Sequence, residues 1–276
     1  MTNDYSVLML LWYKEKPEYL RASLESMVRQ TIPPSEYVFV QDHDIPSELT
    51  SVIKSNVGNV SVKYVDAYDL FGKGFGSLLA RGIEHCSYEL IARMDSDDIA
   101  FSDRCERQLA VFKENPQLAV VGGTIAEFSD TPEEITSYRV VPEKNHDIIK
   151  FAKYRCPFNQ PSVMFRKTVI INVGNYNTSY SACEDYELWY RVLKSGGVGY
   201  NIPEPILYFR AGEDLIKRRG KKDQYLSFVA IKKRMRNDKF INWFDFQFSV
   251  NIQRFFYYSP FFIQKWMYRY FLRKNI

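Results

Sequence analysis

The stretch "YELIARMDSDDIAFSDR", residues 88–104, places several acids directly behind a short apolar segment. The segment "YELIARMD" is typical of a buried strand, because a brief apolar run is bounded by polar residues. Asp95, Asp97 and Asp98 follow at its end, and Asp103 comes a turn or two later. Carboxylates this close raise one another's pKa unless a cation lies among them. The cluster is therefore either a solvated loop or a metal site.

The spacing Asp95-Ser96-Asp97 puts two carboxylates two residues apart on a turn. Hard oxygen ligands of this kind suit Mg²⁺ or Mn²⁺, which hold few protein ligands and leave positions for phosphate oxygens. A divalent ion that bridges a diphosphate would neutralise a departing nucleotide diphosphate. The alternative is a polar loop that caps the following helix, and acid-rich loops of that kind are common.

Strand-like and helix-like segments alternate along the first third of the chain. The helical segments begin near Pro17, cover 46–56, and follow the glycine-rich turn at the start of "FGKGFGSLLARGIEHC". This alternation predicts right-handed βαβ units and an α/β fold with a mostly parallel sheet flanked by helices. The predicted strands are residues 5–13, 36–42, 60–67 and 88–95.

Two acids occupy the position where such a sheet binds its ligands. Ligands lie beyond the carboxyl ends of parallel strands. Asp42 follows the second predicted strand and Asp95 follows the fourth. We therefore expect both carboxylates to face one crevice.

The second half of the chain contains fewer clear elements. "LAVVGGTIAEF", residues 118–128, predicts a strand broken by its two glycines, and residues 162–170 predict another strand at an edge of the sheet. "CEDYELWYRVLKSGG", residues 183–197, predicts a helix with Glu184 and Asp185 in its first turn. Acids at that position stabilise the helix dipole, so a catalytic role needs further support. "KRRG", residues 217–220, is either a phosphate clamp or a solvated basic loop.

The 276 residues suit one large α/β domain or two smaller ones. The four cysteines are far apart and form no CxxC pair, which favours neither a disulfide framework nor a zinc site and fits a reducing compartment. The N-terminus lacks the features of a signal peptide, and no window is long and apolar enough for a transmembrane helix. These features predict a cytoplasmic protein.

Charge divides the chain into two parts. Residues 1–215 contain 22 Lys and Arg against 30 Asp and Glu, a net charge of −8. Residues 216–276 contain 15 against 3, a net charge of +12. We therefore predict a catalytic domain over 1–215 and a basic, aromatic helical extension over 216–276. The extension is the part expected to meet an anionic surface.

The extension has two interpretations. In residues 240–276 aromatic residues alternate with bases, and no acid follows Asp245. A pair of helices could pack on the catalytic domain or on a second copy of the chain, as a homodimer. Alternatively, the aromatics enter the headgroup layer of a membrane while Lys265, Arg269, Arg273 and Lys274 meet anionic lipid, which would place the protein peripherally on the inner face of the plasma membrane.

Several motifs together resemble a known family. The chain is similar to family 2 glycosyltransferases with the GT-A fold, and in particular to bacterial enzymes of the amylovoran, capsule and O-antigen type. The resemblance runs from about Ser6 to Gly220. It depends on an ordered set of segments: "SVLMLLWYKEKPEYLRASLESMVRQT", "VFVQD", "YELIARMDSDDIAFSDRCERQL", "VVGG", "CPFNQPSVMFRK", "CEDYELWYR" and "KRRG".

The resemblance implies roles for individual residues. Asp95 would face the ribose or a metal-bound water, and Asp97 would bind the metal, Mn²⁺ or Mg²⁺. Asp185 matches the family's catalytic base, with Glu184 beside it. The remaining matches concern the nucleotide: Leu11 and Trp12 would line its pocket, Asp42 would accept from the base, Lys73 would approach the nucleotide, and Arg218 and Arg219 would stabilise the leaving diphosphate.

The implied activity is direct inverting transfer of a hexose-type sugar from a UDP-sugar to a saccharide or lipid-linked saccharide. Asp185 would take the proton of the acceptor hydroxyl as it attacks the anomeric carbon. Two other classes remain open. A nucleic-acid-binding protein could use the basic aromatic tail, although the crevice of the sheet is acidic and we predict no nucleic-acid partner. A catalytically inactive scaffold is disfavoured by the intact acidic motifs.

Overall fold

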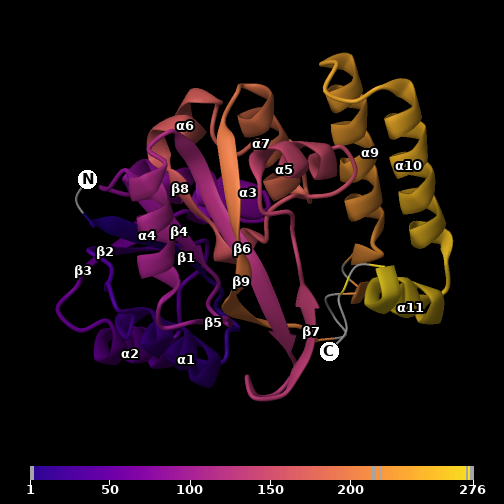
Figure 1. Cartoon of the computed structure of the whole chain (residues 1–276). Coiled ribbons are helices and arrows are strands. Elements are labelled where there is room, and N and C mark those ends of the chain that lie inside the picture. The colour runs from indigo at the N-terminus through magenta and orange to yellow at the C-terminus, as the bar shows by residue number, and fades with distance from the viewer. Residues whose placement is uncertain (1–2, 213–215, 218, 272, 274–276) are drawn as a thin grey trace.

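A nine-stranded sheet forms the centre of the molecule, with strand order β3-β2-β1-β4-β8-β6-β9-β5 and β7 paired to β6 (Figure 1). The computed structural model describes residues 3–212, 216–217, 219–271 and 273. The strands are β1 (Tyr5–Leu11), β2 (Glu36–Gln41), β3 (Ser61–Asp66), β4 (Leu90–Met94), β5 (Ile99–Ala100), β6 (Leu118–Phe128), β7 (Ile135–Arg139), β8 (Met164–Arg166) and β9 (Val198–Arg210).

Helices cover both faces of this sheet, and alternate strand residues explain why. In β1, Val7 and Met9 pack with one helix layer while Leu8 and Leu10 pack with the other, because successive strand side chains point to opposite faces. The first layer holds α1 (Pro17–Val28), α2 (Ser47–Asn56) and α4 (Arg104–Glu114). The second holds α3 (Phe75–His85), α5 (Asn145–Ala152), α6 (Lys167–Asn172) and α7 (Glu184–Lys194).

The pairing of strands confirms the predicted α/β fold. β1 is parallel to both β2 and β4, and β2 is parallel to β3. Beyond β4 the sheet is mixed, since β8 is antiparallel to β4 and β6, whereas β6 and β9 are parallel. The carboxyl ends of β1, β2 and β4 therefore meet at one edge, where Asp42 and the Asp95–Asp98 turn lie.

Two details of the second half were predicted wrongly. The strand predicted over 162–170 is only Met164–Arg166, and it lies between β4 and β6 rather than at an edge. The chain turns into α6 at Lys167, whose backbone N–H donates to Glu89 O (2.7 Å) and whose ammonium donates to Cys86 O (2.6 Å).

The glycine pair does not break β6, which runs continuously from Leu118 to Phe128. A Cβ on Gly122 would lie 2.4 Å from Asn201 Oδ1, so a larger residue at position 122 would displace the Asn201 side chain. The glycines instead permit close packing, and the pairing of β6 with β9 shifts its register just after Gly123.

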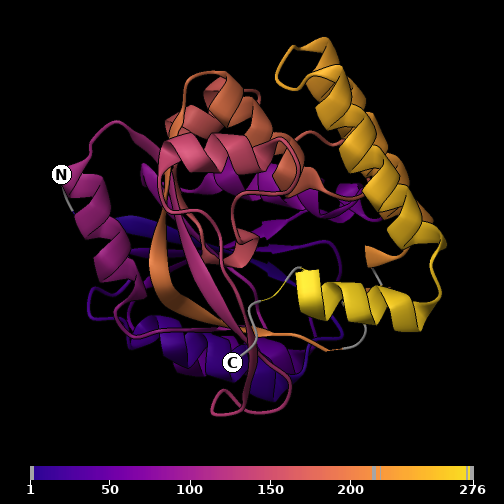
Figure 2. The same cartoon turned by 45° about the vertical axis from the view of Figure 1, so that its right-hand side comes forward.

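The C-terminal extension contains α9 (Lys222–Asn237), α10 (Trp243–Tyr258) and α11 (Phe261–Phe271) in its described part. Both views show α9 and α10 side by side, with α11 crossing near β7 (Figures 1 and 2). Ile231 and Met235 of α9 pack on Tyr186 and Tyr190 of α7. The division into domains at residue 215 stays a prediction, because residues 213–215 lie outside the described part.

A buried lysine marks this contact between α9 and the catalytic part. Lys232 donates from its Nζ to Lys153 O and Tyr186 Oη, each at 2.5 Å. Burial lowers the pKa of Lys232 to about 7, against the opposing effect of Asp245. In the described ranges, no helix is long and apolar enough to cross a membrane.

Candidate active site

The acidic turn after β4 is held from several directions. Ser23 Oγ of α1 donates to the backbone O of Asp95 (2.9 Å), and Ser96 Oγ donates to Glu15 Oε2 (2.5 Å). Asp98 Oδ1 accepts the backbone N–H of Arg210 at 2.9 Å. The turn therefore has a fixed conformation, built from the ends of β1, β4 and β9.

Arg93 and Arg210 are the cations of this turn. Arg93, buried within β4, contacts Asp95 Oδ1 and the backbone O of Met94 with its guanidinium. Arg210 donates from Nε to Asp97 O (3.1 Å), and its guanidinium carbon lies 3.7 Å from the centre of the Tyr19 ring. Each cation is directed by a strand toward the carboxylates.

These two cations do not compensate the acids fully. Burial, then the charges of Asp95 and Glu15, raise the pKa of Asp97 to about 7. Burial and the charges of Asp97 and Asp95 raise the pKa of Asp98 well above its usual range. Asp98 Oδ2 is buried and has no hydrogen-bond partner among the residues that the structure describes. The turn thus has an excess of negative charge.

The chemistry of this turn fits a hard divalent cation. Its ligand atoms are carboxylate oxygens, one of them buried without a partner, and Mg²⁺ and Mn²⁺ prefer such oxygens. Within the described ranges, no three or more His, Cys, Asp and Glu side chains are arranged to hold a metal ion by themselves. An ion at Asp95 and Asp97 would need further ligands from water or substrate, as Mg²⁺ sites commonly do.

The second acidic pair lies at the start of α7, as predicted. Cys183, the residue before the helix, has a left-handed backbone (φ 61°), which turns the chain so that Glu184 and Asp185 form the first helical turn. Asp185 Oδ1 accepts from the Tyr186 N–H (2.7 Å), and Asp185 Oδ2 accepts from the Cys156 thiol (3.4 Å).

The two acidic pairs converge although they are far apart in the sequence. Burial, then the charge of Asp185, raise the pKa of Glu184 to about 7. Arg93 opposes this rise and Asp95 adds to it, so both residues of the β4 region act on Glu184. The structure therefore brings Asp95, Glu184 and Asp185 to one site, where Arg93 contacts Asp95 and acts on Glu184 through its charge.

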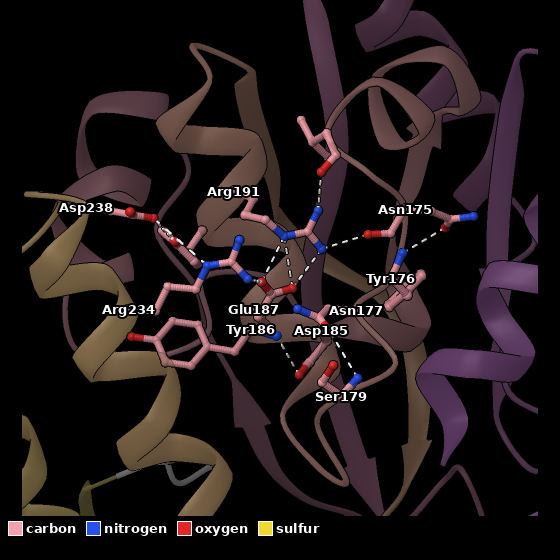
Figure 3. Close-up of polar contacts among 12 residues, drawn as sticks. Asn175, Tyr176, Asn177, Ser179, Asp185, Tyr186, Glu187, Arg191, Arg234 and Asp238 are labelled. Atoms are coloured by element: carbon pink, nitrogen blue, oxygen red, sulfur yellow. Dashed lines mark hydrogen bonds and ion pairs between the residues drawn. The ribbon is translucent and has the colours of Figure 1, made fainter. Parts of the chain in front are cut away.

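An ion-pair network fixes the position of α7 (Figure 3). The buried Glu187 accepts from Arg191 Nη2 and from Arg234 Nη1 of α9, each at 2.7 Å. Arg191 also donates to Asn175 O at 2.7 Å. Asp185 lies two residues before Glu187 on the same helix, so the network fixes the backbone that carries its carboxylate.

The residues predicted for the nucleotide lie at the neighbouring strand ends. Leu11 is buried at the end of β1, and Trp12 after it is 53% exposed. Asp42 Oδ1 contacts His43 Nδ1 at 2.9 Å. Lys73 is exposed in the turn before α3. These positions face the same edge as the acidic turn.

Aromatic rings add to this surface. His43 stacks on Tyr13 with ring centres 4.3 Å apart, and Phe71 meets His43 edge-on at 4.3 Å. The three rings come from the segments after β1 and β2 and from the turn before α3. Such a stack offers a flat apolar surface of the kind that a nucleobase can stack on.

Arg219 contacts an aromatic ring of the C-terminal extension. Its guanidinium carbon lies 5.2 Å from the centre of the Tyr268 ring of α11. Arg218, predicted with it, lies outside the described residues. Their assignment to the leaving diphosphate stays a prediction.

Several residues of this site were missed in the sequence. Glu15, Arg93 and Cys156 stand inside the segments of the family resemblance but received no predicted role, and Arg210 lies in none of those segments. Arg93 gave a usable signal, since a charged residue at a buried position of "LIARM" needs a specific partner. Glu15, Cys156 and Arg210 come from separate segments of the chain, and only the fold brings them to one site.

Comparison with known proteins places this geometry in context. The family model of "Glycosyl transferase family 2" matches residues 8–174. The chain is 35% identical over 217 residues to the amylovoran biosynthesis glycosyltransferase AmsE of Erwinia amylovora, covering 78% of this chain and 80% of that protein. It is 32% identical over 249 residues to an Escherichia coli UDP-Gal:alpha-D-GlcNAc-diphosphoundecaprenol beta-1,3-galactosyltransferase, covering 90% of this chain and 89% of that protein.

A solved structure shares the fold. The mannosyltransferase PcManGT from Pyrobaculum calidifontis, in complex with GDP-Man and Mn²⁺, aligns with a TM-score of 0.64 at 13% sequence identity. The alignment covers 91% of this chain and 69% of that one. At this identity the likeness concerns the fold, which is the GT-A arrangement of sheet and helices.

Proposed function

The chain belongs to glycosyl transferase family 2, and we propose that it moves a hexose-type sugar from a UDP-sugar, with inversion, to a saccharide or lipid-linked saccharide in bacterial surface polysaccharide synthesis. The observation that carries this proposal is the convergence of the Asp95–Asp98 turn with Glu184 and Asp185. Membership of this family indicates that the reaction is the transfer of a glycosyl group. The E. coli relative, named for a UDP-sugar donor and a diphosphate-linked acceptor, supports the choice of substrates.

In this proposal the residues divide the work. Asp97 and Asp95 would hold Mn²⁺ or Mg²⁺, which would neutralise the leaving diphosphate when bound. The Mn²⁺ complex of the mannosyltransferase supports this assignment. Leu11, Trp12, Asp42 and Lys73 would bind the nucleotide, and Asp185 would accept the proton of the acceptor hydroxyl.

A panel of nucleotide sugars tests the proposed donor. Purified protein is incubated with Mn²⁺ and UDP-, GDP- and ADP-hexoses, and release of the free nucleotide diphosphate is measured with and without EDTA. We expect hydrolysis of one or a few UDP-hexoses only, and loss of that hydrolysis with EDTA. Preferential turnover of a GDP- or ADP-sugar would contradict the UDP assignment.

We also propose that the extension attaches the protein to an anionic membrane surface. Phe244, Phe248, Ile252 and Phe255 are exposed and spaced by three or four residues, so they form one stripe along α10. Phe262, Trp266 and Tyr270 form a similar exposed stripe on α11. Aromatic stripes on a basic helical element are typical of peripheral membrane contact.

Binding to phosphatidylglycerol vesicles tests this attachment. We expect the protein to sediment with such vesicles and to be partly released by high salt, because charge attraction is screened and aromatic insertion is not. The double variant Phe248→Gln/Phe255→Gln should bind about tenfold or more weakly, since full burial of one Phe contributes about 1.5–3 kcal/mol.

The matched control is Ile171→Gln, which removes an exposed apolar side chain (41% exposed) from α6, outside the extension. This variant should bind vesicles as the wild type does. If the wild type ignores anionic vesicles at low salt, and sedimentation velocity shows a dimer that the double variant dissociates, the stripes cover a second copy of the chain and the membrane proposal is wrong.

A further inference from the structure

Four arginines from separate segments of the chain form a cluster near Tyr268 of α11. Arg139 ends β7, Arg155 follows α5, Arg219 precedes α9 and Arg273 follows α11. Arg273 and Arg219 share the ring of Tyr268, with their guanidinium carbons 4.1 Å and 5.2 Å from its centre. Tyr268 donates to Glu127 Oε1 of β6 at 3.2 Å, so α11 holds these two cations against the sheet.

The nearby carboxylates do not balance these charges. Glu127 of β6 is paired with Arg273 (2.5 Å) and also accepts from Ser137 Oγ (2.8 Å). Arg139 and Arg155 have no ion pair with any carboxylate in the described part of the chain, and the Nε of Arg139 is buried without a hydrogen-bond partner. Among the carboxylates of the described residues, ion pairs reach only Arg273 of the four arginines.

The electrostatics show that the arginines act on one another. Burial, then the charges of Arg219 and Arg273, lower the pKa of Arg139 to about 10. Burial, then the charges of Arg139 and the same two residues, lower the pKa of Arg155 to about 10. Like charges brought together under partial burial are unfavourable unless an anion joins them.

The cluster is connected directly to the candidate base. Arg155 precedes Cys156 in the chain, and the Cys156 thiol donates to Asp185 Oδ2 at 3.4 Å. Asn159 Nδ2 donates to the backbone O of Arg139 at 3.1 Å, which ties the end of β7 to the same loop. The loop that contains Cys156 and Asn159 therefore links the arginine cluster to Asp185.

The sheet order separates this cluster from the nucleotide residues. Leu11 and Asp42 follow β1 and β2, on one side of β4, whereas β7 is paired to β6, on the other side. A donor bound at the ends of β1 and β2 would reach Asp185 from the first side. The arginines thus occupy the side left for the acceptor.

We propose that Arg139 and Arg155 bind the phosphate or diphosphate group of an anionic acceptor whose sugar hydroxyl is presented to Asp185. The inference rests on the proposed function and adds the residues that would hold the acceptor's phosphate. Guanidinium groups suit phosphate oxygens because they donate two parallel hydrogen bonds. Tyr268 and the exposed aromatic stripe share α11, so such a group would lie near the surface proposed to contact lipid.

Calorimetry with undecyl diphosphate tests this site. The ligand is titrated into full-length protein first alone and then with the donor site saturated by UDP and Mn²⁺, and undecanol in the same detergent serves as the uncharged comparison. We expect undecyl diphosphate to bind in both cases. Arg139→Gln and Arg155→Gln should each weaken that binding about tenfold or more, since each removes a charge-assisted phosphate contact, with UDP affinity unchanged.

The matched control is Arg29→Gln, which removes a surface arginine paired only within α1. This variant should bind both ligands as the wild type does, and the melting temperatures of the two cluster variants should not fall, because each removes a repelled cation. A purely structural role predicts lower melting temperatures with unchanged diphosphate binding, and would overturn the inference.

The donor arm separates the inference from the proposed function. If UDP displaces undecyl diphosphate, or if Arg139→Gln weakens UDP binding as strongly as diphosphate binding, the arginines are part of the donor site. The inference is then wrong, and the proposed function is unaffected. The inference also fails if undecyl diphosphate binds no better than undecanol. If UDP itself does not bind, the proposed function fails and the inference falls with it.

Discussion

Replacement of Asp185 by Asn should lower the turnover number by about 10²–10⁴-fold, the usual contribution of a positioned general base. The change keeps the size of the side chain, and its carbonyl oxygen can still accept from the Tyr186 N–H. What is lost is the ability to take a proton from the attacking hydroxyl. Steady-state kinetics of sugar transfer, with calorimetry of UDP binding, measures both effects.

The affinity for UDP should remain nearly unchanged, because the lost interaction forms mainly in the transition state. Asp4→Asn is the control, since Asp4 is exposed and contacts Ser35 Oγ (2.9 Å) at the amino end of β1, the edge opposite the site. The competing base is Glu184, whose raised pKa of about 7 suits proton transfer near neutral pH. If Asp185→Asn keeps transfer within about tenfold of wild type and Glu184→Gln does not, the base is Glu184.

Much of the fold could be predicted because it depends on local patterns. The first four strands have the short apolar runs of a buried parallel sheet, and the helices between them have apolar residues at helical spacing. The first and last residues of the strand Met164–Arg166 could not be predicted in this way. The apolar residues Val169 and Ile170 continue the pattern of the strand, yet they pack from α6, and only the pairing with β4 and β6 shows where the strand ends.

The residues of the candidate site also differ in whether a local sequence pattern could predict them. Asp95, Asp97, Glu184 and Asp185 could be proposed because they stand in compact motifs at element ends. Arg139 could not, because it lies in no motif, and its significance depends on three other segments folding against it. Residues of a site that are contributed singly by distant elements leave no local pattern in the sequence.

The raised pKa of Asp97 indicates how the free energy of unfolding depends on a cation at the acidic turn. The folded pKa of Asp97, about 7, lies above its ordinary value of 3.8. The folded state therefore binds more protons than the unfolded state between these values. The free energy of unfolding should fall as the pH rises from about 4 to about 7, and this loss is complete at physiological pH. Without metal, the ionised Asp97 destabilises the protein.

We therefore expect Asp97→Ala to have opposite effects on stability and on nucleotide binding. At pH 7.5 in EDTA, the variant should melt at a higher temperature than the wild type, because a buried, repelled carboxylate is removed. Mn²⁺ with UDP should then stabilise the wild type strongly and the variant little, since ligands that bind only the folded state raise its stability. Calorimetry should show UDP affinity that depends on Mn²⁺ in the wild type and is equal with Mn²⁺ and with EDTA in the variant.

Asp103→Ala provides the matched comparison, because Asp103 belongs to the same acidic stretch but precedes α4 without a side-chain capping bond. It should leave the response to Mn²⁺ intact. Should the wild type bind UDP equally well in EDTA, the turn is not a metal site, and Arg93 and Arg210 would have to neutralise the diphosphate alone. Should Asp97→Ala instead melt well below the wild type in EDTA, the carboxylate stabilises the turn through its own contacts. If the melting temperatures and the UDP affinities both change as expected, the acids after β4 are close together because they bind a cation that accompanies the donor.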